Sequence, residues 1–370
     1  MLLLPPVPRQ SPMASTAPEP GDTPSRGPDR LLADAAQVAR HADARLSAAI
    51  SDLFLPDFVR PTDSQRATMA TMLTALVEDV EADLRSAVSE RLGETAPPVL
   101  GVSRIPIVRP IFDRAGVLKD RELIALLLTR AEEHRIRDAL LRVAHVQPGP
   151  AAPPPLDIPP GIERALMTAE QRRTGKLGEP RLAVADLPAE LLHRLLWWSA
   201  AALRDYLDRC SQVEAGERDE AISAAVQVLL LRHDEGQGLE GSAMRAALSS
   251  VPSDERLVDT FRTGRFTLFV ALLAVRARLD FTPAFLLAAD PGIGALAVLL
   301  RAIEATTQAA APILLQMAAV NQLSDVRLEE RVSDFLDLDV AAAQDAVRPW
   351  RLDPAFRSAM ADIGRERRQR

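Results

Sequence analysis

Residues 254–320 constrain the fold more than any other stretch, because they form a run of apolar segments separated by helix-breaking residues. The run is interrupted at Gly264, at Thr282-Pro283 and at Asp290-Pro291-Gly292. These breaks predict four short helices in succession. Between Arg265 and Leu279, apolar side chains occupy two adjacent faces, so this helix must be covered on more than one side. The stretch therefore predicts the centre of an all-helical stack.

The composition fits a closely packed helical protein. Apolar residues make up 47% of the chain but aromatic residues only 4%, so the core must be built largely from alanine, leucine and valine. Ala and Leu are strong helix formers, and small side chains let helices approach closely. The net charge of −7 disfavours binding to nucleic acid or to an anionic membrane, which needs a basic surface. We expect neither partner.

Proline-rich segments suggest how the chain is divided. Eight prolines lie in residues 1–29 and seven in residues 147–161, and such segments bury too little apolar surface to fold. The apolar start MLLLPPV is too short for a secretory signal or a membrane span, and Met1 and Met13 are both possible starts. We predict a disordered N-terminus at 1–29, a helical domain at 30–146, a linker at 147–160, a second helical domain at 161–320 and a charged helical tail at 321–370.

Two long helices are expected near the start of the chain. From Arg30 to Leu53, apolar residues recur every three or four positions and form a seam suited to packing on another helix. Thr62 is a candidate N-cap for a second helix, whose apolar face runs from Met69 to Ala87. A short loop joins the two, which favours an antiparallel hairpin. Pairing of the first seam with a helix outside the chain is the alternative.

Shorter helices then follow in pairs. Residues 121–143 predict one helix with Leu123, Leu126 and Leu127 inward, and a second with Ile136, Leu140 and Leu141 inward. Successive helix pairs of this size are typical of HEAT-like repeats and related α-solenoids. No strict sequence repeat is visible. We predict an all-α fold of stacked helical hairpins in a HEAT-like array, without a sheet.

Two segments resemble nucleotide-binding motifs, but their surroundings do not fit. Residues 292–297 match GxGxxA, yet the segment before them is helical in pattern, and the acidic residue expected about 20 positions on is replaced by Met317. We interpret this motif as a turn between helices. Thr174-Gly175-Lys176 lacks the first glycine of a phosphate-binding loop, and Leu177 follows the lysine. We interpret it as a loop.

The titratable residues do not form a catalytic or metal-binding pattern. No two of the five histidines have the spacing of a helical zinc site, and none neighbours a cysteine. Asp337 and Asp339 are two positions apart and do not share a helix face. We therefore expect no cofactor, no metal ion and no catalytic residues. Cys210 is the only cysteine, which suits a reducing cytoplasm.

The helix predicted from Pro188 to Cys210 carries a tryptophan on its polar side. At about 100° per residue, Cys210 falls with the leucines on the inward arc, whereas His193, Trp197 and Arg204 lie on the opposite side. Trp197 can pack on a neighbouring layer with Arg204 beside its ring. It can instead be an exposed anchor for a partner, since Trp and Arg are enriched among residues that dominate binding energy. Trp197, His193 and Arg204 are our candidate protein-interface residues.

Three segments resemble a bacterial family known as domain of unknown function 2336, common in alphaproteobacteria. They are residues 75–100 (ALVEDVEADLRSAVSERLGETAPPVL), residues 117–127 (VLKDRELIALL) and residues 256–303, which begin RLVDTFRTGRFTLFVALLAVRARL. The resemblance spans residues 30–320. It implies an all-helical, HEAT-like protein with no established activity, so it assigns no functional residues.

These observations favour a cytoplasmic helical scaffold or regulator that binds another protein. One alternative is an enzyme whose site is built from scattered residues, since fold alone does not fix function. Another is a nucleic-acid binder that uses Arg262, Arg265, Arg276 and Arg278. The acidic balance weighs against the second alternative.

Overall fold

The computed structural model describes residues 27–50, 62–101, 105–146, 158–175 and 178–353, and residues 356, 357, 359, 360 and 363. Over these ranges the regular elements are helices, and extended pairing is limited to a single bridge between Thr174 and Pro180. The prediction of an all-α fold is confirmed. The disorder expected for residues 1–29 is wrong for residues 27–29, because a helix begins at Gly27. Residues 1–26, and residues 147–157 of the expected linker, lie outside the described residues.

The helices follow one another through short connections. In chain order they are α1 (Gly27–Ile50), α2 (Asp63–Leu92), α3 (Pro98–Gly101), α4 (Val108–Ala115), α5 (Arg121–Val146), α6 (Pro160–Arg172), α7 (Ala189–Cys210), α8 (Ala215–Arg232), α9 (Leu239–Leu248), α10 (Asp254–Arg262), α11 (Phe266–Ala277), α12 (Phe281–Ala288), α13 (Gly294–Ala302), α14 (Thr307–Val320), α15 (Asp325–Asp337) and α16 (Val340–Val347). Short 3-10 turns, η1 (Gly93–Thr95), η2 (Val184–Asp186), η3 (Glu235–Gln237) and η4 (Arg348–Arg351), connect or end them.

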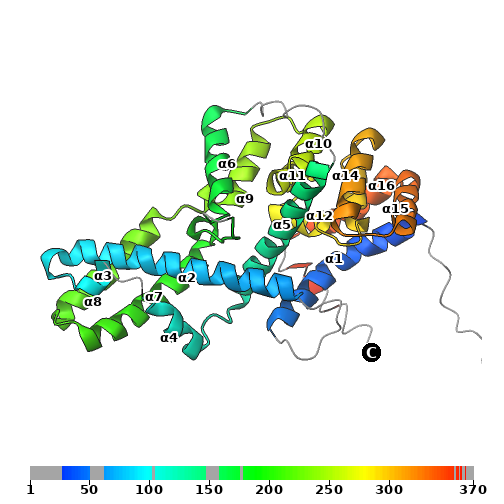
Figure 1. Ribbon diagram of the computed structural model, residues 1–370. Coiled ribbons are helices and arrows are strands. Elements are labelled where there is room, and N and C mark those ends of the chain that lie inside the picture. Colours follow the sequence, from blue (N-terminus) through cyan, green and yellow to red (C-terminus); the bar gives the residue numbers. More distant parts are fainter. Residues whose placement is uncertain are drawn as a thin grey trace, which may run out of the picture.

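Buried apolar side chains gather into two clusters. The larger combines α1, the C-terminal half of α5, α6 and α9–α16, and we call this part the large lobe. The smaller combines α2–α4, the N-terminal half of α5, α7 and α8, and we call it the small lobe. Figure 1 shows α2 running along the small lobe beside α7 and α8, with α1 below α14 and α15 in the large lobe. Each lobe takes helices from both sides of residues 147–160, so the packing does not divide the chain at the expected linker.

Residues 254–320 form the centre of the large lobe, as predicted, but as five helices, α10–α14, and not as four. The additional break separates α13 from α14. Glu304 adopts a left-handed conformation with φ +56°, and the N–H of Ala305 donates to the carbonyl of Leu300 at 3.0 Å. Thr306 then caps α14 by accepting a hydrogen bond from the N–H of Ala309. The break escaped prediction because a glutamate occupies a position that usually holds glycine.

The first two helices begin near the predicted places but do not form a hairpin. Thr62 starts α2 with a reciprocal capping box to Gln65. However, α1 packs mainly on α13, α15 and α5, whereas α2 packs on α8, α5 and α7. The close contact of α1 with α13 depends on Gly294, because a Cβ atom there would lie 2.7 Å from Oδ2 of Asp34. The expected hairpin is wrong because each helix finds its apolar partner far away in the sequence.

Residues 121–146 form a single helix, α5, where two helices were predicted. Leu123 and Leu127 enter the small-lobe cluster, and Ile136 and Leu140 enter the large-lobe cluster. No Gly or Pro interrupts the charged residues between them, so the helix continues from one lobe into the other. The expected charged tail is likewise part of the large lobe, since Phe335 of α15 and Trp350 of η4 are buried in its core.

Candidate protein-binding face

The buried side of α7 fixes which side faces outward. Leu191, Leu195 and Leu203 are buried in the small lobe, where α7 packs on α8, α2 and α4. Trp198 meets Phe112 of α4 edge to face, with ring centres 6.4 Å apart and planes at 85°. The apolar arc expected from the sequence is therefore the packed arc, and the opposite arc is exposed.

Trp197 lies on that exposed arc. It is 37% exposed, and its indole N–H donates to Nε2 of His193, one turn earlier, at 3.1 Å. The two rings lie 6.2 Å apart at 63°. The structure thus brings together two of the three candidate interface residues. Because both rings sit on one helix and are joined by a hydrogen bond, the indole presents a partly exposed surface in a fixed orientation.

Arg204, the third candidate, does not lie beside the tryptophan ring. Its guanidinium forms two hydrogen bonds of 2.9 Å to the carboxylate of Asp219 on α8, which raises the pKa of the arginine and lowers that of the aspartate. The arginines that stack on aromatic rings within the described ranges are Arg301, on Phe335, and Arg357, on Trp350. The structure therefore does not show the alternative in which Arg204 packs beside the Trp197 ring, and Arg204 instead ties α7 to α8.

Six of the exposed positions of α7 form one continuous row along the helix. They recur every three or four residues, and we call them the α7 stripe: Glu190, His193, Trp197, Ala201, Arg204 and Asp208. Beside the stripe, Arg194 pairs with Asp120 and Glu122 at the start of α5. Asp208 pairs with Arg218 at 2.9 Å. Most charges on and next to the stripe are thus matched within the molecule, and Trp197 lies near its middle.

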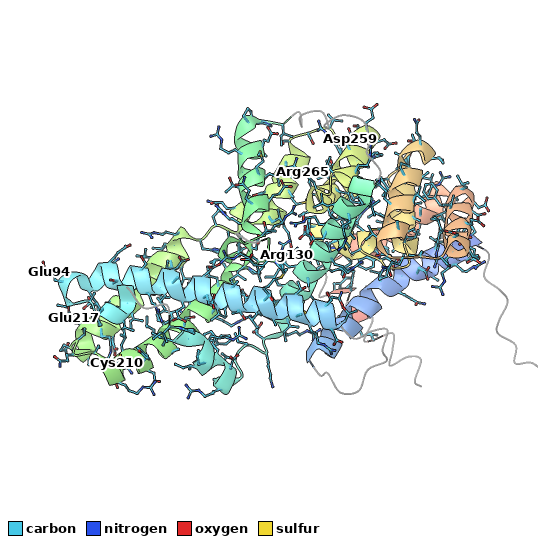
Figure 2. The ribbon with its side chains drawn as sticks, in the orientation of Figure 1. Glu94, Arg130, Cys210, Glu217, Asp259 and Arg265 are labelled. Carbon is cyan, nitrogen blue, oxygen red and sulfur yellow. The ribbon has the colours of Figure 1, made fainter. Side chains whose placement is uncertain are left out.

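Cys210 is the last residue of α7, and it is exposed and free. The prediction that it faces inward is wrong. Cys210 lies on the apolar arc by its angular position, but the last three residues of α7, 208–210, are all exposed. Figure 2 shows Cys210 near the far end of the small lobe, next to the start of α8.

A buried layer of charges, which was not predicted from the sequence, separates the two apolar clusters. We call it the polar layer. Arg130 of α5, only 3% exposed, donates to Oε1 of Glu240 at 3.1 Å and lies 3.9 Å from Asp186. Glu133 accepts hydrogen bonds from Arg173 at 2.8 Å and from Thr267 at 3.0 Å. Figure 2 shows Arg130 near the middle of the molecule, where the lobes meet.

The polar layer is strongly desolvated. Burial raises the pKa of Glu240 and lowers that of Arg173, because removal from water disfavours the charged form. The Nε atoms of Arg130 and Arg173 are buried and have no hydrogen-bond partner among the described residues. A sequence signal was present: charged residues in α5 lie between apolar positions that belong to two different cores. Their partners, however, come from distant segments, so only the fold reveals the layer.

A small cavity of about 290 Å³ lies in the small lobe between α2, α7 and the end of α8. It is lined by leucines and by a few polar groups that include Asp83, His233 and Asp234. Nε2 of His233 lies 2.9 Å from the carbonyl oxygen of Leu187, within hydrogen-bond distance. The carboxylate of Asp234 accepts a hydrogen bond from the N–H of Gly236. His233 and Asp234, two of the polar groups that line the cavity, are thus already engaged by neighbouring backbone groups.

The two motif-like segments have structural roles. Residues 292–297 cover the end of the turn that follows helix α12 and the first turn of α13, so they join two helices as predicted. The carboxylate of Asp290 accepts hydrogen bonds from the N–H groups of Gly292 and Ala295, at 3.2 and 3.0 Å. An aspartate thus occupies the position that a phosphate takes in a dinucleotide site. The N–H of Gly175 donates to the carbonyl of Glu179 in a tight loop, whereas Lys176 lies outside the described residues.

In the described ranges, no three His, Cys, Asp or Glu side chains are grouped so that they could hold a metal ion. Among the helices described here, none has both the length and the apolar character needed to cross a bilayer.

Fold and site together define an all-helical, two-lobed protein with a braced tryptophan on an exposed helix face. The chain belongs to the bacterial family described as "uncharacterised protein conserved in bacteria" (DUF2336), whose profile matches residues 159–348, or 190 of the 370 residues (348 − 159 + 1). The expected resemblance is confirmed, over a span that starts and ends later than residues 30–320. The match includes α7 and its stripe. No curated protein and no solved structure gives a significant match.

Proposed function

We propose that this protein is a helical scaffold or regulator that binds another protein, and that the α7 stripe is its binding face. The observation that carries the proposal is Trp197, a large aromatic side chain that is partly exposed and held by His193. Tryptophan is strongly enriched among residues that dominate the energy of protein interfaces.

The geometry of the stripe suits binding in two further ways. The indole is already oriented by the hydrogen bond to His193, so a partner immobilises little additional side-chain freedom when it binds. The flanking charges of Arg204 and Asp208 are already matched by Asp219 and Arg218. A partner can therefore cover the stripe without leaving these charges unpaired, which is the main cost of burying ionic groups.

Two coarser features complete the proposal. The succession of short helices α9–α14 supports a HEAT-like arrangement of the large lobe, in which stacked helices present an extended surface. A cytoplasmic location is supported by the single free cysteine, Cys210, which is exposed on the surface. Both remain parts of the proposal.

The alternatives have less support. The enzyme alternative has the 290 Å³ cavity with His233 and Asp83, but the imidazole lies within hydrogen-bond distance of a backbone carbonyl. For the nucleic-acid alternative, Arg265 is paired with Glu170, and Arg276 with Asp254. These two guanidinium groups are engaged inside the large lobe and are poorly placed to contact phosphates.

Affinity capture from a bacterium that encodes the chain tests the proposal. Tagged wild type, Trp197→Ala and Leu231→Ala are used as baits, and the retained proteins are identified by mass spectrometry. Leu231 is the matched control because it is an exposed apolar residue of α8, 86% exposed and outside the stripe. We expect Trp197→Ala to lose a specific protein that wild type and Leu231→Ala retain. Equal retention by all three baits would refute the α7 stripe as the binding face.

A further inference from the structure

We propose that the α7 stripe binds a second copy of the same chain, so that two α7 helices pack antiparallel across a twofold axis close to Ser199. This inference rests on the proposed function of the stripe and names its partner. In the proposed dimer, Trp197 of each copy packs over Ala201 of the other.

The shape of the stripe is self-complementary. Trp197 is the largest exposed side chain of the stripe, and Ala201, one turn later, is exposed and is its smallest. A twofold axis midway between them places the bulky residue of one copy against the small residue of the other, and the reverse. In an interface of this symmetry each contact occurs twice, so one matched pair of positions provides two buried tryptophans. A different protein could bind through Trp197 alone, and its binding would not require a small residue at position 201.

The charges permit the same arrangement. The axis brings each stripe residue near its counterparts in the second copy, where unpaired like charges would repel. Arg204 is already paired with Asp219, Asp208 with Arg218, and Arg209 with Asp205. With the axis at position 199, Glu190 of one copy lies opposite Asp208 of the other, whose carboxylate is already paired with Arg218. The chain has a net charge of −7, and this face carries no net excess of acidic side chains at its centre.

The size of the face sets the expected strength. A helix of 22 residues is about 33 Å long, and one face of it covers less than the roughly 800 Å² per partner found in stable interfaces. The start of α5 and the face of α8, which are tied to α7 by Arg194 and Arg204, extend the contact. We therefore expect a dimer that dissociates on dilution.

Sedimentation velocity over a range of concentrations tests the pairing. Wild type should move from the mass of one chain, 40.2 kDa, towards twice that mass as concentration rises. Trp197→Ala removes the bulky side chain, and Ala201→Trp fills the space that the small side chain leaves for the partner's tryptophan. Each variant alone should raise the dissociation constant by about 30-fold or more, because a central tryptophan is typically worth at least about 2 kcal/mol.

Mixing the two variants gives the decisive result. One chain then supplies two alanines and the other two tryptophans, so that each tryptophan again faces an alanine. We expect the mixture to regain the dimer that both variants lost. Ala311→Trp on α14 is the matched control, since Ala311 is also an exposed helical alanine, and it should dimerise like wild type. Thermal unfolding of each variant verifies that it is folded, and Ala201→Trp retains Trp197 should Trp197→Ala prove unstable.

The outcomes separate this inference from the proposed function. A wild type that stays monomeric at every concentration overturns the dimer, but a different protein captured through Trp197 would leave the proposed function standing. A wild-type dimer that neither variant weakens also overturns the inference, because association then uses another surface; the proposed function is then decided by the affinity capture alone. A mixture that stays monomeric while both single variants are impaired overturns the pairing of Trp197 with Ala201.

Discussion

Trp197 lies between the interior and the surface, and its exposure sets what its removal should cost. The side chain is 37% exposed, so most of the ring packs on the helix surface and the rest faces solvent. Buried tryptophans cost about 3–5 kcal/mol when replaced by alanine, and exposed residues cost within about 0.5 kcal/mol. We expect Trp197→Ala to lower the free energy of unfolding by about 1–2 kcal/mol, measured by urea denaturation with circular dichroism.

Leu231→Ala is the control for this measurement, because that side chain is 86% exposed. It should change the free energy of unfolding by no more than about 0.5 kcal/mol. A loss above about 3 kcal/mol for Trp197→Ala would show that the indole is a structural residue. Trp197 would then no longer qualify as an interface anchor.

His134 makes stability depend on pH near neutrality. Burial lowers its pKa from the usual 6.5, against the opposing influence of Asp138, whose carboxylate lies 3.2 Å from Nε2. The folded state thus favours the neutral ring, and the unfolded chain takes up the proton more readily. The contribution of His134 to the free energy of unfolding should be fully present above pH 6.5 and should be lost as the pH falls below that value.

Melting temperatures between neutral and mildly acidic pH test this expectation. His134→Asn should flatten the decline on the acidic side. His193→Asn serves as the control because the imidazole of His193 lies on the exposed face of α7. If the decline is unchanged in His134→Asn, other groups cause the loss of stability in acid.

At the scale of the element, a buried carboxylate starts helix α4. Glu81 of α2 accepts hydrogen bonds from the N–H groups of Ile107 and Val108, each at 2.9 Å, and it also pairs with Arg85. The start of a helix leaves N–H groups without partners, and Ile107, the N-cap residue, offers no side chain to satisfy them. Glu81 therefore joins α2 to α4. Its carboxylate caps the start of α4 in place of a side chain from the N-cap residue.

Glu81→Ala should lower the free energy of unfolding by about 3–5 kcal/mol, because it leaves the buried Arg85 without its carboxylate and frees two amides. Urea denaturation measures the change, and hydrogen exchange should show faster exchange at Ile107 and Val108. Glu78→Ala is the matched control, one turn earlier on the same helix but exposed. A loss no greater than that of the control would mean that solvent replaces Glu81 without cost.

At the scale of the whole molecule, the polar layer determines how the lobes are joined. Arg130 lies between Asp186 and Glu240, which come from segments near the starts of α7 and α9. Neighbouring Glu132 accepts a hydrogen bond from Gln65 of α2 at 2.8 Å. Through α5, the layer thus touches both lobes. Removing one partner of a buried ion pair costs more than the pair contributes, because the other charge is left buried.

We expect Arg130→Ala to lower the free energy of unfolding by about 3 kcal/mol, measured by urea denaturation. Arg262→Ala is the control, since that arginine is only half-buried at the end of α10. A loss below about 1 kcal/mol in Arg130→Ala would mean that the acidic groups become solvated or protonated without disturbing the lobes.

Features that depend on residues close together in the chain could be predicted from the amino-acid sequence. The N-cap at Thr62 and the turn at Asp290 were predicted, because each hydrogen bond joins residues at most five positions apart. The helical character of the chain and the inward arc of α7 follow from local periodicity in the same way. These interactions form within a helix or at its ends, whatever the rest of the chain does.

Which helices pack together, and which residues lie between them, became known only from the three-dimensional structure. The packing of α1 on α13, the burial of Arg130 and the pairing of Arg204 with Asp219 all join segments whose contact no local pattern specifies. The sequence placed Trp197 on the polar side of α7 but left open whether a second layer covered it. That question was settled by where the other helices pack, since a side chain is exposed only when no distant segment buries it.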